Sequence, residues 1–181
     1  RTMGYRVVVL DPDLGSPAGQ VADRQICAPY DDARALDDLA ASCAAVTTEF
    51  ENVPAATLER LAQSTVVHPG AAAVAIAQDR IAEKSFLLAG GFAVAPFRPV
   101  ERASDLTAAL MAVRLPALLK TSRLGYDGKG QVTISTPEEA PDALRTLRGV
   151  ACVMEERLDL ELELSVVLAR GADGHVASFP P

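Results

Sequence analysis

The chain has 181 residues, of which 49% are hydrophobic, and its formal net charge is −7. This length suits one ordinary domain or two small ones, and the apolar content excludes a largely disordered chain. The negative charge argues against nucleic acid or an anionic membrane surface as a partner, and no apolar run approaches the length of a membrane span.

The first third of the sequence alternates predicted strands and helices. Residues Val7–Leu10 form an uninterrupted apolar run, which is typical of a strand covered on both faces. Further strands are expected at 45–50 and 66–67, with helices at 36–44 and from Pro54 to about residue 63. This βαβ progression predicts a parallel sheet of Rossmann type.

The remaining sequence predicts a second kind of architecture. Residues 71–89 are alanine-rich and helical, with a break near Gln78-Asp79 and an end at Gly90-Gly91. A helix capped by Ser104 or Asp105 follows; then come strands at 117–120, 130–135, 151–157, 161–169 and 175–179, and a helix at 138–148. We therefore expect an α/β chain with two domains, residues 1–90 and the α+β residues 91–181.

A glycine-rich loop follows Lys120 and leads into the next predicted strand. A lone lysine at a strand end usually only extends its ammonium group into solvent. Asp127-Gly128 is a common dipeptide of hairpin turns. The loop has about nine residues, however, whereas a hairpin needs about two to five. Its length and glycines favour a mobile lid whose amides approach phosphate, with Lys120 and Lys129 adding positive charge.

Two acidic segments lie at predicted strand ends. Glu49 and Glu51 follow a strand at its carboxyl end, where open α/β sheets bind ligands, but the same loop also serves to start the next helix. On the residues alone the two interpretations are evenly balanced. The segment 155–158 is either a solvated strand end or a segment that binds adenine through its backbone and ribose through a carboxylate. Glu161 and Glu163 alternate with leucines, which favours a solvent-facing side of a strand.

A charged helical segment contains Asp79, Arg80, Glu83 and Lys84. The spacing is typical of i,i+4 pairing on a helix surface, and the alternative is that Arg80 points toward phosphate. The three cysteines are odd in number and widely spaced, which indicates reduced thiols in a cytoplasmic protein.

Several of these segments together resemble the ATP-grasp superfamily. They are Thr48–Val53, Ala77–Arg80 with Glu83-Lys84, Gly125–Gln131 and Glu163–Val166, in the order of the superfamily. The Gly-Tyr-Asp-Gly-Lys-Gly-Gln loop and the Glu-Phe-Glu-Asn segment are the most specific. Within the superfamily they are similar to the 5-(carboxyamino)imidazole ribonucleotide synthases, which carboxylate a purine precursor.

The resemblance implies a role for each matching residue. Arg80 and Lys120 contact ATP phosphates, and the lid consists of Gly125, Tyr126, Asp127, Gly128, Lys129, Gly130 and Gln131. Adenine is held by Glu155, Glu156, Arg157 and Leu158, mainly through backbone groups, and ribose by Glu163. Tyr126 and Asp127 approach 5-aminoimidazole ribonucleotide together with Glu49 or Glu51. The catalytic set is Tyr126, Asp127 and Lys129.

The implied reaction is an ATP-dependent carbon–nitrogen ligation. Bicarbonate is activated as carboxyphosphate and captured by the amine of 5-aminoimidazole ribonucleotide, giving ADP and phosphate. Mg²⁺ is the implied cofactor and a homodimer the implied assembly of the full-length protein. The ends of the chain look truncated, with the metal ligands expected outside it, so we expect this 181-residue chain alone to be inactive.

Two other functions are compatible with the same motifs. One is a different ATP-grasp ligase, either a formate-dependent glycinamide ribonucleotide transformylase or a biotin carboxylase-like enzyme. The other is a non-catalytic nucleotide-binding module.

Overall fold

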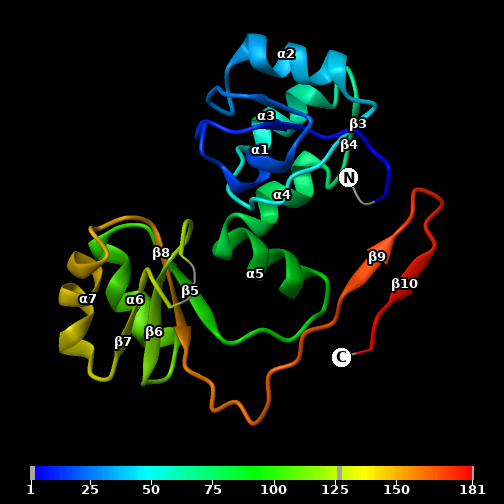
Figure 1. Ribbon diagram of the computed structural model, residues 1–181. Coiled ribbons are helices and arrows are strands. Elements are labelled where there is room, and N and C mark those ends of the chain that lie inside the picture. Colours follow the sequence, from blue (N-terminus) through cyan, green and yellow to red (C-terminus); the bar gives the residue numbers. More distant parts are fainter. Residues whose placement is uncertain (1–2, 126–127, 181) are drawn as a thin grey trace.

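The computed structural model describes residues 3–125 and 128–180. Its N-terminal region holds two parallel strand pairs (Figure 1). β1 (Val8–Leu10) pairs with β2 (Arg24–Ile26), and β3 (Ala45–Val46) pairs with β4 (Val66–Val67). Parallel partners need a crossover, which contains α1 (Pro17–Val21) in the first pair and α3 (Ala55–Leu61) in the second. The predicted parallel α/β organisation is confirmed.

The N-terminal core lies between these strands and α2 (Ala33–Ser42), α3 and α4 (Ala71–Ala77). Its buried side chains are Leu36, Leu39, Val53, Leu58, Leu61, Val67 and Val74. Strand β1 is only half-buried, so the prediction that it is covered on both faces is wrong. Among the described strands, β1 is hydrogen-bonded to β2 alone, so its other edge has no strand partner.

Two differences from the predicted elements have local causes. The strand expected at 45–50 ends at Val46, because its partner β4 is two residues long and offers no further backbone groups. Helix α1 and strand β2 were not predicted at all. Ser16 caps α1 by accepting a bond from the Gly19 amide at 3.1 Å, and Pro17 begins it. This Ser-Pro signal is visible in the sequence.

Helices α4 and α5 (Arg80–Ala89) are separated at Gln78-Asp79, as predicted. Asp79 caps α5, since its carboxylate accepts bonds from the amides of Ile81 and Ala82 at 2.9 and 3.3 Å. No helix among the described residues is long and apolar enough to cross a membrane.

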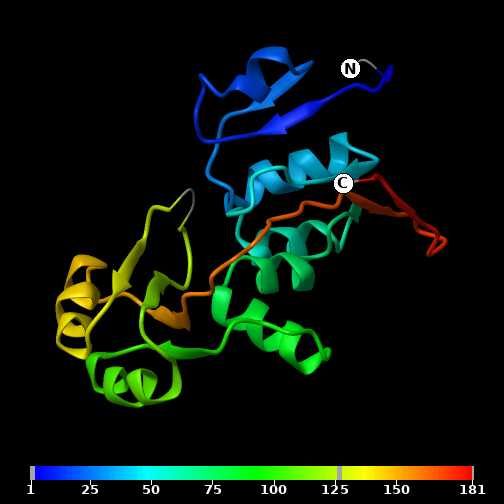
Figure 2. The same cartoon turned by 90° about the horizontal axis from the view of Figure 1, so that it is seen from below.

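The C-terminal region is built on a four-stranded antiparallel sheet. Its order is β5 (Phe97–Val100), β8 (Cys152–Glu156), β6 (Ala117–Thr121) and β7 (Gln131–Ile134). Helices α6 (Leu106–Ala112) and α7 (Ala140–Thr146) cover one face and bury a core that includes Leu106, Ala109, Ala117, Leu119, Ile134, Leu144, Cys152 and Met154 (Figures 1 and 2). The other face is left for α5 and the site described below.

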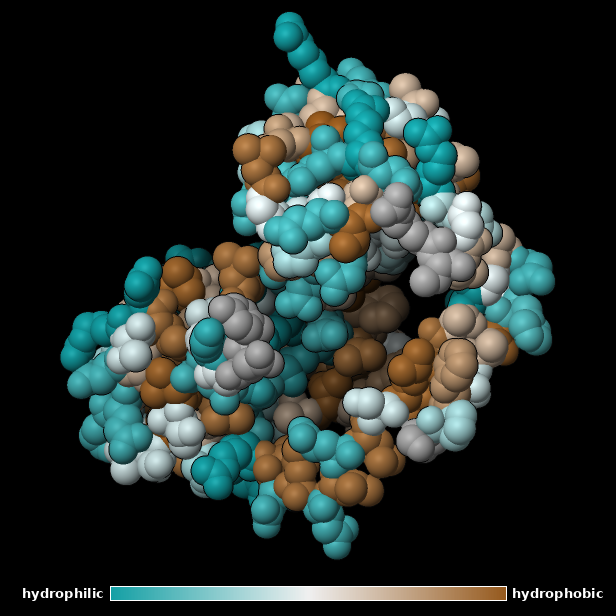
Figure 3. Space-filling view, in the orientation of Figure 1, coloured by the Kyte–Doolittle hydropathy of each residue, from teal (hydrophilic) through white to brown (hydrophobic). Residues whose placement is uncertain are grey.

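The segment after β8 runs away from this sheet (Figures 1 and 2). The strand predicted at 161–169 is wrong: only β9 (Leu168–Arg170) forms, paired with β10 (Val176–Ser178). Alternation shows which side of a strand would be apolar, but a strand also needs a neighbouring strand for its backbone groups. In the described chain the pairing with β10 and the residue after it reaches back only to Val167, whose carbonyl oxygen accepts a bond from the Phe179 amide at 3.0 Å, and no strand pairs with 161–166. Leucines at 158, 160, 162 and 164 are exposed. Figure 3 shows hydrophobic surface along the lower edge of the molecule, where this segment runs in Figure 1.

Candidate functional site

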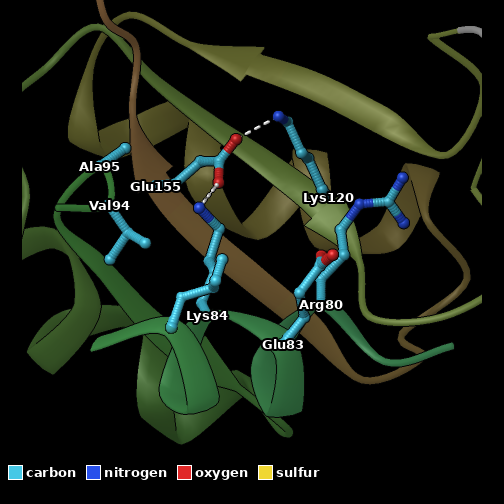
Figure 4. Close-up of a pocket in the computed structure, with 8 residues that line it drawn as sticks. Arg80, Glu83, Lys84, Val94, Ala95, Lys120 and Glu155 are labelled. Atoms are coloured by element: carbon cyan, nitrogen blue, oxygen red, sulfur yellow. Dashed lines mark ion pairs between the residues drawn. The ribbon is translucent and has the colours of Figure 1, made fainter. Parts of the chain in front are cut away.

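Helix α5 presents a charged face to the uncovered side of the four-stranded sheet. Arg80 and Lys84 are four residues apart and therefore lie on one side of the helix. With Glu83 they line a pocket of about 330 Å³ that Lys120 and Glu155 enter from the sheet. Figure 4 shows Glu155 between the amino groups of Lys84 and Lys120. Leu87, Val94 and Ala95 complete the lining.

The sheet register explains why Lys120 and Glu155 meet. Leu119 is buried against the helices, so Lys120 projects from the opposite face. Glu155 on β8 stands opposite Leu118 of β6, two residues before Lys120. The two charged residues are thus diagonal neighbours on one face, within reach of long side chains.

Glu155 is a buried carboxylate with two cationic partners. Its residue exposure is 6%. One carboxylate oxygen lies 2.7 Å from Lys84 Nζ, and the other forms an ion pair with Lys120 Nζ. Lys84 Nζ also lies 5.6 Å from the centre of the Phe97 ring. The interpretation of this residue as part of a solvated strand end is wrong, because a buried carboxylate requires such partners.

The partners of Glu155 determine its ionisation. Burial is the largest single influence and raises its pKa, but the hydrogen bonds and charges of Lys120 and Lys84 together outweigh it and hold the pKa below its ordinary value. A carboxyl whose pKa is lower in the folded state stabilises the fold fully above its unfolded pKa of about 4.3, and this contribution is lost as the pH falls through the folded pKa.

We therefore expect Glu155→Gln to reduce the acid sensitivity of this protein. In urea unfolding between about pH 6 and pH 3, the free energy of unfolding should fall less steeply in the variant than in the wild type, because the substituted group no longer titrates. The matched control is Glu59→Gln, a neutralisation on the exposed side of α3. Equal pH slopes for Glu155→Gln and the wild type would contradict the linkage.

Arg80 holds the base of the glycine-rich loop. Its guanidinium donates to the carbonyl oxygens of Thr121 at 3.1 Å and Gly125 at 2.8 Å, and its amide donates to Ser122 O at 2.9 Å. The preceding Asp79 accepts bonds from Ser122 Oγ at 2.7 Å and Arg123 Nε at 3.2 Å. The alternative of i,i+4 pairing on the α5 surface is therefore wrong: these charges point to the loop and the pocket.

The same connection between helices also reaches the other candidate loop. The Gln78 side-chain amide donates to the carbonyl oxygens of Glu51, at 2.6 Å, and Val53. Glu49 and Glu51 are themselves exposed in that loop. Three consecutive residues, Gln78, Asp79 and Arg80, thus tie the loop around Glu51 to the glycine-rich loop.

The glycine-rich loop closes an antiparallel hairpin between β6 and β7, as predicted. Gln131 stands opposite Lys120, and Thr121 N donates to Gly130 O at 2.8 Å. Gly130 has φ +74°, and a Cβ there would lie 2.7 Å from Thr121 Oγ1. A Cβ at Gly125 would meet the Thr121 hydroxyl, the Arg80 guanidinium and a backbone carbonyl at 3.0–3.1 Å. Both glycines are therefore required for the close approach of the two ends of the loop.

Two residues of the loop cannot be placed in this way. Tyr126 and Asp127 lie outside the described residues, so their predicted roles rest on the sequence. Gly128 (φ +75°) and Lys129 lie in the described part of the loop, on the β7 side.

The remaining predicted site residues point away from this pocket. Glu156 bonds to Arg114 at 2.6 Å and lines a second, shallow pocket with Arg157 and Leu158. The backbone amides of Glu156 and Arg157 donate to Pro96 O and Pro116 O at 2.9 and 3.1 Å, so they are engaged within the protein. Glu163 is exposed in the segment without regular structure. Of the predicted site residues that the structure describes, Arg80, Lys120 and Glu155 line one pocket together.

Lys84 is the partner of Glu155 that sequence reasoning missed. Its spacing from Arg80 was noted, but it was explained by pairing along the helix. The usable signal was that two cations four residues apart share one helix face, so both reach whatever one of them reaches. Its partner Glu155 lies 71 positions away, which no local pattern indicates.

Comparison with known protein families agrees with this geometry. Residues 85–181 match the ATP-grasp domain, and residues 1–78 match the preATP-grasp domain of ribonucleotide synthetases. The chain belongs to the ATP-grasp family. The matched domain includes the four-stranded sheet, the glycine-rich hairpin and the second half of α5, residues 85–89.

Curated relatives of this ATP-grasp chain include enzymes named N5-carboxyaminoimidazole ribonucleotide synthase. That of Brucella melitensis is 44% identical over 97% of the chain, and that of Bacillus subtilis is 38% identical over 99%. The chain spans 49% and 47% of the length of these two proteins, about half in each case.

Solved structures of proteins with similar names share the fold over almost the whole chain. The N5-carboxyaminoimidazole synthetase of Staphylococcus aureus, in complex with ADP, superposes with a TM-score of 0.93 at 37% identity. The synthase of Aspergillus clavatus, in complex with ADP and 5-aminoimidazole ribonucleotide, gives 0.85 at 25% identity. The alignments cover 99% of this chain and 48% and 47% of those chains.

Proposed function

We propose that this chain is the nucleotide-binding part of an enzyme that carboxylates 5-aminoimidazole ribonucleotide with bicarbonate and ATP, in purine biosynthesis. The observation that carries the proposal is the pocket beside the glycine-rich hairpin. There, three cationic side chains, those of Arg80, Lys84 and Lys120, face two carboxylates in a chain whose net charge is −7. The names of the relatives and the ligands of the Aspergillus clavatus complex support this choice of substrate.

The chemistry requires such a pocket. An oxygen of bicarbonate attacks the γ-phosphorus of ATP and ADP leaves, giving carboxyphosphate. The amine of the ribonucleotide then attacks its carbonyl carbon. The C–N bond forms, the bond between that carbon and the phosphate oxygen breaks, and the departing phosphate can take the proton that the amine nitrogen loses. Negative charge on the transferred group is stabilised by cations that are already in place, which we assign to Lys120 and Arg80. Residues 125–131 would cover carboxyphosphate and exclude water.

The other predicted roles remain part of the proposal. Lys129 joins the phosphate site, Tyr126, Asp127 and one of Glu49 and Glu51 approach the ribonucleotide, and Glu163 binds ribose. Because the amides of Glu156 and Arg157 already donate hydrogen bonds within the protein, adenine would be bound by backbone groups from Leu158 onward or by carbonyl oxygens. The tie through Gln78–Arg80 supports a shared site for the two loops.

Four finer assignments also belong to the proposal. The division into domains at residue 90 comes from the pattern of elements and the cytoplasmic location from the cysteines, whereas the homodimer and Mg²⁺ as cofactor are implied by the resemblance. The described residues include no group of three or more side chains suited to hold a metal ion, and Glu155 in the pocket is already paired with two lysines. These residues therefore do not by themselves fit Mg²⁺.

The full-length protein tests the proposed function. Purified enzyme with ATP should form ADP only when bicarbonate and 5-aminoimidazole ribonucleotide are both present, and ¹⁴C from bicarbonate should enter the product. Formate with glycinamide ribonucleotide is the control for the alternative ligase. Turnover with formate and glycinamide ribonucleotide, but not with bicarbonate and 5-aminoimidazole ribonucleotide, would replace the proposal by that alternative. ATP binding without any turnover would favour the non-catalytic module.

A further inference from the structure

Lys84 is one of the three pocket cations but has no part in the chemistry proposed so far, yet it makes a close contact with the most buried charged group of the pocket. Its side chain is 17% exposed, compared with 23% for Lys120 and 8% for Glu155. Its Nζ lies 2.7 Å from Glu155 Oε2 and 5.6 Å from the Phe97 ring centre. A lysine held this way is oriented from two sides, by a carboxylate and by an aromatic face.

The charges of this triad do not cancel. Lys84 and Lys120 contribute two positive charges, and Glu155 contributes one negative charge. Each carboxylate oxygen faces a different lysine, so either lysine alone can keep Glu155 paired (Figure 4). The pocket can therefore give up one lysine to an anionic ligand without leaving a buried carboxylate unpaired.

Removing Lys84 would change that balance. Glu155 would then depend on Lys120 alone, and moving the Lys120 ammonium to a phosphate would leave an uncompensated buried carboxylate. Such a charge is costly, and here it would also stand beside an anionic ligand. Lys120 would consequently be held back from the phosphate by its own partner.

We infer that Lys84 is a positioning residue of the nucleotide site, which neutralises Glu155 and so frees Lys120 to bind the polyphosphate of ATP. The inference rests on the proposed function, because it needs ATP to occupy this pocket. It assigns the Glu155 side chain to the control of Lys120, in addition to the adenine role implied for its backbone.

The test compares five variants of the full-length protein, one of them Lys120→Ala, by calorimetric titration with ATP and by steady-state kinetics. Lys84→Met should raise the Kd and KM for ATP roughly tenfold to a hundredfold, with a smaller effect on kcat. Lys84→Arg keeps the charge and should restore most of the affinity. The double variant Lys84→Met/Glu155→Gln should also recover, because the carboxylate that competes for Lys120 is gone. Arg145→Gln removes an exposed cation on α7 and is the charge-matched control.

Each outcome decides one point. Wild-type ATP affinity in Lys84→Met would overturn the inference, and so would a loss that Glu155→Gln does not relieve, since Lys84 would then act directly or through the fold. If Lys120→Ala weakens ATP binding while Lys84→Met does not, the proposed function stands and only the inference fails. A wild-type protein that does not bind ATP would overturn both.

Discussion

Lys120→Ala should abolish most of the ATP-dependent carboxylation by the full-length protein. Lys120 is the pocket cation on the rigid sheet, and its neighbour Leu119 is fully buried, so the chain cannot shift to replace the lost ammonium. Removing one preorganised group that stabilises transition-state charge typically costs about a hundredfold to a thousandfold in kcat. Product formation from ¹⁴C-bicarbonate measures the loss.

This variant is suited to separate chemistry from folding. Glu155 keeps its contact with Lys84 at 2.7 Å when Lys120 is removed, so the buried carboxylate stays paired and the fold should persist. Thermal unfolding checks this, and Arg145→Gln again controls for the loss of one positive charge. Near-normal turnover by a folded Lys120→Ala protein would rule out its role at the phosphates.

Gly130→Ala is expected to displace the glycine-rich loop. A residue other than glycine at φ +74° costs about 1–2 kcal/mol. The added Cβ would also lie 2.7 Å from Thr121 Oγ1, while Thr121 N is bonded to Gly130 O at 2.8 Å and cannot move aside without breaking the hairpin. Because a misplacement of about 1 Å can cost as much as a hundredfold in rate, we expect turnover to fall at least roughly tenfold.

The chain offers a matched control for this substitution. Gly128 has almost the same φ, +75°, but among the described residues the nearest atom to a Cβ there is Gln131 Nε2 at 3.9 Å. Gly128→Ala therefore carries the backbone strain without the collision and should lose less activity. Combining Gly130→Ala with Thr121→Ala should recover part of the loss. Equal activities for Gly130→Ala and Gly128→Ala would show that the close approach of residue 130 to Thr121 does not affect turnover.

The sequence predicted the elements whose signals are local. Asp79 after an alanine-rich run marked the break between α4 and α5, and the glycines after Lys120 marked a long hairpin. The strand at 161–169 failed for a different reason. Its alternating leucines satisfy a local pattern, whereas a strand also needs a neighbouring strand, and which segment lies beside it is a property of the whole fold.

The candidate site divides in the same way. The sequence by itself determined that a lysine ends one strand, that a glycine-rich loop follows it, and that the motifs are those of ATP-grasp proteins. Only the tertiary structure decided that Glu155 is buried between Lys84 and Lys120. The same holds for Arg80, whose guanidinium donates hydrogen bonds to carbonyl oxygens of the glycine-rich loop. Propensities and turn chemistry act over a few residues, but burial and charge pairing depend on which strands and helices meet, and Lys84, Lys120 and Glu155 come from three elements that only the fold brings together.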